Sequence, residues 1–140
     1  SWVFGAHGHN FLKTIVRLLQ TRPSLDIVAD QQGIPTAAKD LAHVGLALLK
    51  RRLNPGIYHY CSGEPTTWHG FAAYIKERVA TKKDIECHEL KPIKTVDYPT
   101  PAKRPLYSVL DTTKIQACGI QVRPWQKYAD ETVDTLLQEK

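Results

Sequence analysis

Two polar loops of this sequence hold the side chains best suited to binding a ligand. Residues 30–36 place Gln31, Gln32 and Thr36 around a glycine and a proline. An amide side chain both donates and accepts hydrogen bonds, so one of these glutamines can read the edge of a pyrimidine base. Ordinary turn chemistry accounts for the same residue types equally well, and the sequence alone leaves both interpretations open.

The second loop, residues 98–111, is braced by prolines and carries its cations at the centre. A planar guanidinium matches the oxygens of a diphosphate with two parallel hydrogen bonds, which makes Arg104 the best candidate for an anion contact. The hydroxyl group of Tyr107 can join the same site. The alternative is that Arg104 is a surface cation paired with Glu64 or Asp111.

Two residues near the start of the chain can also contact a ligand. Trp2 ends a short apolar segment, where a large aromatic side chain either packs in the core or offers a flat apolar face to a sugar ring. Asn10 is a good helix N-cap, because its side-chain oxygen accepts an N–H group that has no partner within the helix. The same helix N-terminus offers free N–H groups to a diphosphate, and the two roles are compatible.

The elements that must position these residues alternate between strands and helices. Apolar spacing predicts helices over 11–20, from Thr36 to about 52, over 68–80, from Asp111 to about 118, and from Pro124 onward. Strands are predicted over 2–4, 25–29, 57–61 and 85–90, and Asn10, Thr36, Thr67 and Asp111 are the predicted N-caps. This alternation predicts an α/β fold with parallel strands.

Composition and charge place the chain among ordinary globular proteins. Its apolar content is 42%, its charged content is 24% and its net charge is +5, values that argue against disorder. The cations are dispersed except at 50–52 and 82–83, where each run ends a predicted helix and favours its dipole, so no nucleic-acid partner is expected. No apolar run approaches the roughly 18 residues that span a membrane, and no membrane partner is expected.

The cysteines and histidines predict neither a disulfide framework nor a metal site. Cys61, Cys87 and Cys118 are odd in number and lack the C-x-x-C spacing, which indicates free thiols in a reducing cytoplasm. The six histidines are scattered along the chain, so no set of metal ligands is predicted.

Five segments, in this order and at these spacings, resemble the C-terminal half of the dTDP-4-dehydrorhamnose reductase family, within the extended short-chain dehydrogenase/reductase superfamily. They are residues 1–5, 10–12, 30–36, 56–60 and 98–111, and the resemblance runs from Ser1 to about Trp125. It implies the C-terminal portion of a doubly wound, Rossmann-like parallel sheet with a smaller substrate-binding helical lobe. It also implies a dTDP-sugar substrate, with Trp2 beside the sugar nucleotide and the helix after Asn10 directed at its phosphates. It also implies that the whole enzyme reduces dTDP-4-dehydro-L-rhamnose to dTDP-L-rhamnose with NADPH or NADH.

Catalysis is expected outside this chain, because two motifs of that superfamily are missing. No G-x-G-x-x-G turn seats a dinucleotide, and none of the six tyrosines has the lysine four residues on that the catalytic Y-x-x-x-K pair requires. The chain has no methionine and opens within a predicted strand. We therefore expect a fragment with no catalytic residue and no cofactor pocket, whose partners are its own N-terminal domain and, as a homodimer or by self-association, further copies.

The sequence leaves open whether the protein forms a metal-bridged dimer and which member of the superfamily it is. In some relatives an acidic residue at the position of Lys39 helps a divalent ion such as magnesium to bridge two subunits, and lysine makes that metal-bridged dimer doubtful here. Another sugar-nucleotide epimerase, dehydratase or reductase of the same superfamily fits the same segments. So does a non-catalytic relative, such as the regulatory subunit of methionine adenosyltransferase.

Overall fold

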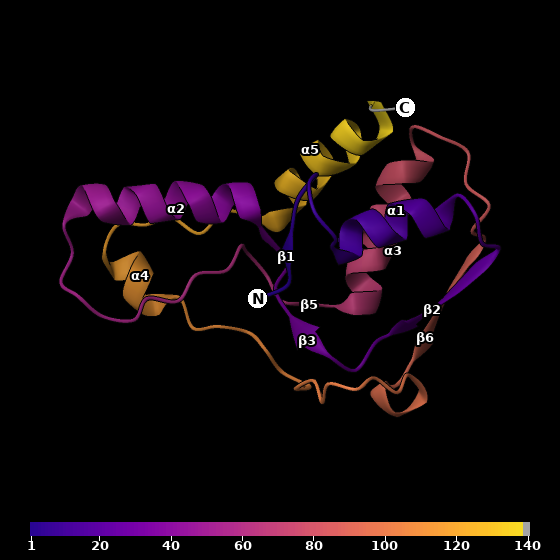
Figure 1. The fold of residues 1–140 in the computed structure, drawn as a ribbon, viewed down its shortest axis with the longest axis horizontal. Helices are drawn as coiled ribbons and strands as arrows, with labels where there is room; N and C mark the ends of the chain where they lie inside the picture. The colour runs from indigo at the N-terminus through magenta and orange to yellow at the C-terminus, as the bar shows by residue number, and fades with distance from the viewer. Residues whose placement is uncertain (139–140) are drawn as a thin grey trace.

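The structure, a computed structural model, describes residues 1–138 as three two-stranded sheets surrounded by helices (Figure 1). The helices are α1 (Phe11–Leu19), α2 (Ala38–Arg51), α3 (Trp68–Ala80), the 3-10 helix η1 (Thr95–Asp97), α4 (Thr113–Ala117) and α5 (Trp125–Gln138). The strands are β1 (Val3–Phe4), β2 (Ser24–Val28), β3 (Gln32–Gly33), β4 (Thr36–Ala37), β5 (Thr66–Thr67) and β6 (Glu89–Ile93). None of the helices described is long and apolar enough to cross a membrane.

Two of the three sheets are parallel, as the predicted α/β fold requires. β1 pairs with β4, and Val3 lies opposite Thr36. β2 pairs with β6 in a longer ladder that begins with Ser24 opposite Glu89. β3 and β5 form the antiparallel pair. Parallel partners need long crossover connections, and here helices lie within those connections.

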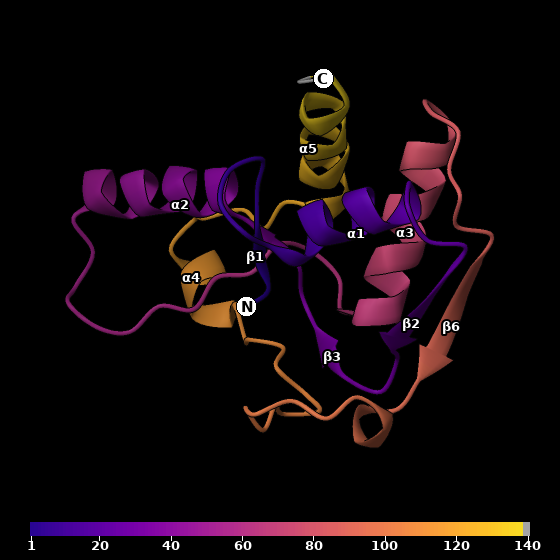
Figure 2. The same cartoon turned by 45° about the vertical axis from the view of Figure 1, so that its right-hand side comes forward.

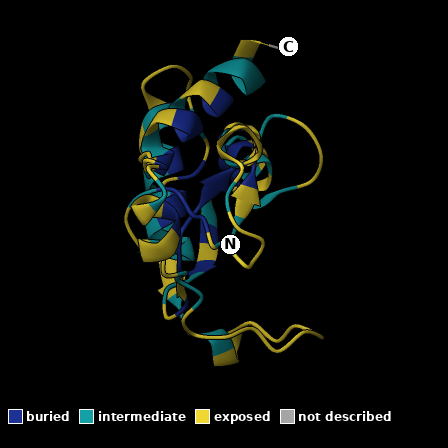
Figure 3. Ribbon diagram, turned by 90° about the vertical axis from the view of Figure 1, so that its left-hand side faces the viewer, coloured by how far each residue is buried: buried dark blue, intermediate teal, exposed yellow. Residues whose placement is uncertain are grey.

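The helices fall into two groups (Figures 1 and 2). α1, α3 and α5 surround the main core, in which Leu12, Phe71 and Ile75 are fully buried. The ring of Trp125 meets that of Phe71 edge-on, with centroids 5.2 Å apart. α2 and α4 lie to one side around a second, smaller core formed by Val44, Tyr60, Ile115 and Ile120. Figure 3 shows the buried residues gathered in the interior, while the long loop after η1 is exposed.

Side-chain caps explain where α1 and α3 begin. The side-chain oxygen of Asn10 accepts a hydrogen bond from the backbone N–H of Lys13 at 3.1 Å. The hydroxyl oxygen of Thr67 accepts from the backbone N–H of Gly70 at 3.0 Å. Each bond satisfies a donor that has no partner within its own helix, and both predicted caps are confirmed.

α2 begins later than the sequence predicts. Thr36 lies in β4, and its hydroxyl donates to the carbonyl oxygen of Ile34 at 3.1 Å instead of capping the helix. The N-cap is Ala37, which makes no side-chain cap bond. The prediction that Thr36 caps this helix is wrong, because pairing with β1 holds the residue in the strand.

Two predicted strands also differ from the structure. Within the described part of the chain, residues 57–61 form no strand, since no segment pairs with them in a ladder. The strand predicted over 85–90 is displaced to β6. The backbone N–H groups of Glu86 and Cys87 donate instead to the carbonyl oxygen of Leu19, which holds this segment against the end of α1. β6 tolerates Pro92 because it is an edge strand.

The last two helices begin close to their predicted starts. α4 begins at Thr113, and the carboxylate of Asp111 accepts the backbone N–H of that residue at 2.9 Å, from one position further out than an N-cap. α5 begins at Trp125, directly after Pro124. A proline suits this place because it has no N–H group to leave unpaired.

Candidate functional site

A pocket of about 320 Å³ lies between α1, β2 and the loop that follows η1. Its walls are mainly apolar, with side chains from Phe11, Ile15, Leu18, Leu25 and Ile27. Gln31 and Arg104 supply polar groups at the same pocket. Small-molecule sites in proteins combine mostly apolar walls with a few placed polar groups and begin at about this size.

Backbone hydrogen bonds bring the two polar loops together. The N–H of Gln32 donates to the carbonyl of Leu106 at 2.7 Å, and the N–H of Ser108 donates to the carbonyl of Gln32 at 2.8 Å. Tyr107 lies opposite Gln32 in this bridge, and its side chain is 63% exposed. The loops 30–36 and 98–111 therefore form one surface, with Gln32 and Tyr107 beside the pocket.

Trp2 approaches this surface through a stack on Trp68. The two indole rings are 3.7 Å apart with an interplanar angle of 12°, and Trp68 lines the pocket. Trp2 holds a φ of 51°, a left-handed conformation that residues other than glycine rarely adopt. A methyl group at Gly33 would lie 2.4 Å from the Trp2 ring, so only glycine permits this close approach.

Gln31 is held at both ends of its side-chain amide. Its oxygen accepts a hydrogen bond from the indole N–H of Trp68 at 3.1 Å. Its nitrogen donates to the hydroxyl oxygen of Thr95, also at 3.1 Å. The side chain is 8% exposed and lines the pocket, so the amide is rigidly placed where a ligand would lie.

Arg104 stands at the same pocket without a partner of its own. No hydrogen bond or ion pair within residues 1–138 engages its guanidinium, and the residue is exposed. Within the same residues neither Glu64 nor Asp111 pairs with it, and the Asp111 carboxylate accepts instead from the backbone and hydroxyl of Thr113. The guanidinium is therefore available to an anion.

The other two predicted site residues lie away from this pocket. Asn10 also donates its side-chain N–H to the carbonyl of Gly5 at 2.8 Å, and it lines a second hollow of about 610 Å³. Thr36 is fully buried. Lys39 lines the second hollow and pairs with Glu131 at 2.9 Å. Within residues 1–138 no cluster of three or more His, Cys, Asp or Glu side chains could hold a metal ion.

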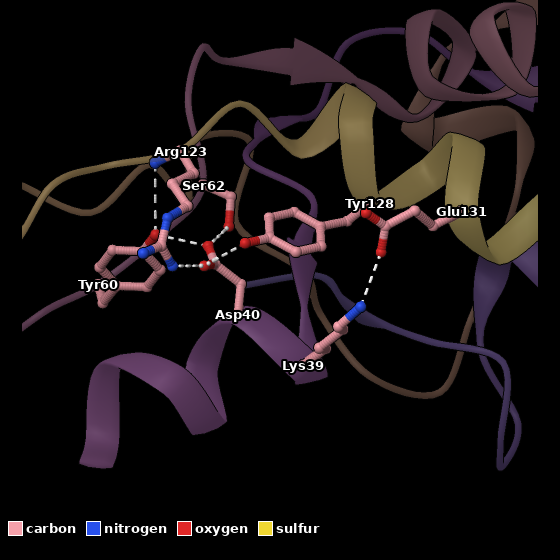
Figure 4. A network of polar contacts seen from close by, with 7 residues as sticks. All are labelled: Lys39, Asp40, Tyr60, Ser62, Arg123, Tyr128 and Glu131. Carbon is pink, nitrogen blue, oxygen red and sulfur yellow. Dashed lines mark hydrogen bonds and ion pairs between the residues drawn. The ribbon is translucent and has the colours of Figure 1, made fainter. Parts of the chain in front are cut away.

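A buried carboxylate that the sequence analysis did not single out joins the two helical groups (Figure 4). Asp40 is fully buried and accepts four hydrogen bonds, from Tyr60 at 2.5 Å, Tyr128 at 2.8 Å, Ser62 at 2.9 Å and Arg123 at 3.1 Å. Its position four residues before the buried Val44 is the signal that could have revealed it, because residues four apart share a helix face.

The hydrogen-bond donors around Asp40 determine the charge of this cluster. Burial raises the pKa of Asp40, but the four hydrogen bonds outweigh burial and leave the pKa below its usual range. Burial, and then the bond to the carboxylate, raise the pKa of Tyr60 to about 12. The cluster therefore holds a carboxylate anion among neutral hydroxyl groups at neutral pH, with Arg123 as its counter-ion.

The parallel strand pairs, with helices in their crossover connections, define part of a Rossmann-like α/β fold. Residues 1–138 match the RmlD substrate binding domain, and the chain belongs to that family. It is 44% identical over 135 residues to the dTDP-4-dehydrorhamnose reductase of Aggregatibacter actinomycetemcomitans, an alignment that covers 91% of this chain and 46% of the relative. The chain thus spans about half the length of the curated relatives it matches.

Solved structures give the same result. A dTDP-4-dehydrorhamnose reductase from Clostridium acetobutylicum superposes with a TM-score of 0.88 at 33% identity, over 98% of this chain and 47% of the other. The enzyme of the same name from Bacillus anthracis, in complex with NADP, superposes with a TM-score of 0.80 at 28% identity, over 100% and 46%. The predicted fold class and the family resemblance are confirmed.

Proposed function

We propose that this chain is the sugar-nucleotide-binding half of a dTDP-4-dehydrorhamnose reductase. The observation that carries the proposal is the pocket between α1, β2 and the loop after η1, where a fixed amide and a free guanidinium share apolar walls. A pyrimidine base fits the apolar part beside Gln31. The diphosphate then meets Arg104, which carries the positive charge that it requires.

The remaining predicted residues take roles around this nucleotide. The Trp2 indole and the Tyr107 hydroxyl lie beside the paired loops, where a sugar attached to the diphosphate can extend. Gln32 holds the loops together through its backbone. Asn10 acts through the helix that it caps, and Thr36, which is buried within β4, acts by holding the strand pair β1–β4 together.

The hydride-transfer chemistry belongs to the other half of the enzyme. This sequence contains neither the glycine-rich turn for a dinucleotide nor a Tyr-x-x-x-Lys pair, so its residues do not fit a nicotinamide cofactor. An N-terminal domain that packs against this chain would hold NADPH or NADH, and the hydride would come from there. The cytoplasmic location, a homodimer and self-association of the isolated fragment are further parts of the proposal.

The proposal is tested by measuring enzymatic turnover. The full-length protein that contains this chain is expected to oxidise NADPH in the presence of dTDP-4-dehydro-L-rhamnose and to release dTDP-L-rhamnose, while residues 1–140 alone produce no turnover. A full-length protein that only epimerises or dehydrates sugar nucleotides would contradict the reductase assignment. Turnover by the 140-residue chain alone would contradict the placement of catalysis outside it.

A further inference from the structure

A chain of hydrogen bonds runs from the surface to the pocket. The carboxylate of Asp30 accepts from the backbone N–H of Thr95 at 2.9 Å and from its hydroxyl at 2.6 Å. The same hydroxyl oxygen accepts from the amide nitrogen of Gln31 at 3.1 Å. The amide oxygen accepts from the indole N–H of Trp68 at 3.1 Å. Three residues, Asp30 from the 30–36 loop, Thr95 from η1 and Trp68 from α3, therefore act on the Gln31 amide.

The donors and acceptors at the two ends allow only one orientation of this amide. An indole N–H can only donate, so Trp68 requires the amide oxygen. An ionised carboxylate can only accept, so the Thr95 hydroxyl proton points to Asp30 and its oxygen is left to accept from the amide nitrogen. A flipped amide would set two donors against each other at Trp68 and two oxygens against each other at Thr95.

Asp30 is ionised at neutral pH. Hydrogen bonds from the Thr95 hydroxyl and backbone, together with the charge of Lys94, lower its pKa. The direction of the hydrogen-bond chain is therefore fixed at neutral pH.

We propose that Asp30 and Thr95 are positioning residues, which fix the Gln31 amide so that the pocket selects the keto pyrimidines thymine and uracil over cytosine. This inference rests on the proposed function, because it places the base in the pocket that Gln31 lines. After its two internal bonds, the amide keeps one N–H and one oxygen lone pair for a ligand.

The edges of the bases explain the selectivity. Thymine and uracil present an N3–H donor beside the C4 carbonyl acceptor, which match the amide oxygen and the amide N–H. Cytosine reverses this order, with an N3 acceptor beside an amino donor. A freely rotating amide would flip and accept either base. The fixed amide instead places its oxygen against the N3 acceptor of cytosine and its N–H against the amino donor. One well-made pair of this kind discriminates between bases by roughly one to two orders of magnitude.

The experiment compares the affinities of the full-length protein for dTDP and dCDP by isothermal titration calorimetry. We expect the parent protein to prefer dTDP, and Thr95→Val, which keeps the shape of the side chain but removes its hydroxyl, to lower that preference about tenfold. Thr95→Ser restores the hydroxyl and is expected to keep the preference. Thr81→Val is the matched control, since the Thr81 hydroxyl bonds to the carbonyl of Arg78 at the end of α3.

A second variant, at the exposed end of the hydrogen-bond chain, tests the direction of these hydrogen bonds without disturbing the fold. Asp30 is exposed, and Asp30→Asn adds a donor that frees the Thr95 proton to point at the amide, so the preference for dTDP is expected to fall. An unchanged ratio of affinities in both Thr95→Val and Asp30→Asn would overturn the inference and leave the proposed function intact. A parent protein that binds neither nucleotide would overturn the proposed function, and the inference with it.

Discussion

Replacing Asp40 with alanine is expected to destabilise the protein by about 3–5 kcal/mol, because three buried hydroxyl groups lose their acceptor at a cost of roughly 1–3 kcal/mol each. The side chain is fully buried, and its loss leaves the hydroxyl groups of Tyr60, Tyr128 and Ser62 without their acceptor. An unsatisfied buried polar group has a large desolvation penalty. Chemical denaturation of the full-length protein, followed by the fluorescence of its tryptophans, measures the change in the free energy of unfolding.

Glu131→Ala is the matched control for this experiment. Glu131 pairs with Lys39 on the surface, where the two side chains are 43% and 64% exposed, so its loss is expected to change the free energy of unfolding by less than about 1 kcal/mol. Equal effects of the two substitutions would show that the Asp40 cluster does not stabilise the packing of the two helical groups.

The same cluster predicts how stability depends on pH. The pKa of Asp40 is lower in the folded protein, so its contribution is fully present above the unfolded value of about 3.9 and is lost as the pH falls through the folded value. The pKa of Tyr60 is raised to about 12, so its contribution is present below the unfolded value of about 10 and is lost as the pH rises toward 12. Asp40→Ala should remove the acid dependence and reduce the alkaline one, because burial, the larger cause of the raised Tyr60 pKa, persists in the variant, and unchanged profiles would contradict this.

Arg104→Ala is expected to weaken dTDP binding by about ten- to a hundredfold, because a charge-assisted hydrogen bond to phosphate contributes roughly 1.5–3 kcal/mol. Arg104→Lys keeps the charge but not the planar fork and should cause a partial loss. Calorimetric titration of the full-length protein with dTDP gives the dissociation constants, and NADPH binding should hardly change.

Lys103→Ala provides the control, because Lys103 adjoins Arg104 in the same exposed loop and does not line the pocket. We expect its affinity for dTDP to stay within about threefold of the parent, as a loosely placed surface charge implies. If Arg104→Ala leaves the dTDP affinity unchanged and lowers the melting temperature instead, the residue stabilises the loop and does not bind the diphosphate.

Local chemistry made much of the fold predictable. Asn10 and Thr67 were recognisable as caps because each begins a run of apolar residues at helical spacing, and the structure confirms both bonds. Thr36 has the same local signature, but its place in a strand depends on Val3, more than thirty positions away. The displacement of the last strand to β6 has a similar cause, because β2 and not the local alternation of residues sets its register.

The candidate site shows the same contrast between residue types that the sequence reveals and contacts that it does not. Gln31 and Arg104 were identifiable by residue type, since an amide and a guanidinium in rigid loops are suited to a base and a diphosphate. Their meeting at one pocket depends on the bridge between Gln32 and Ser108, which spans residues remote in sequence. Thr95 gave no signal of its own, because an isolated threonine in a loop has many possible partners.

The most direct test of the central claim is a titration of the isotope-labelled full-length protein with dTDP, followed by nuclear magnetic resonance. We expect saturable chemical-shift changes of the Gln31 side-chain amide, the Trp68 indole N–H and the Arg104 guanidinium. These are the groups that this structure gathers at one pocket. Signals from α4, which lies in the other helical group, should stay unchanged. Saturable binding that leaves these three groups unshifted, or no binding of dTDP at all, would contradict the claim that this chain holds the nucleotide of the substrate.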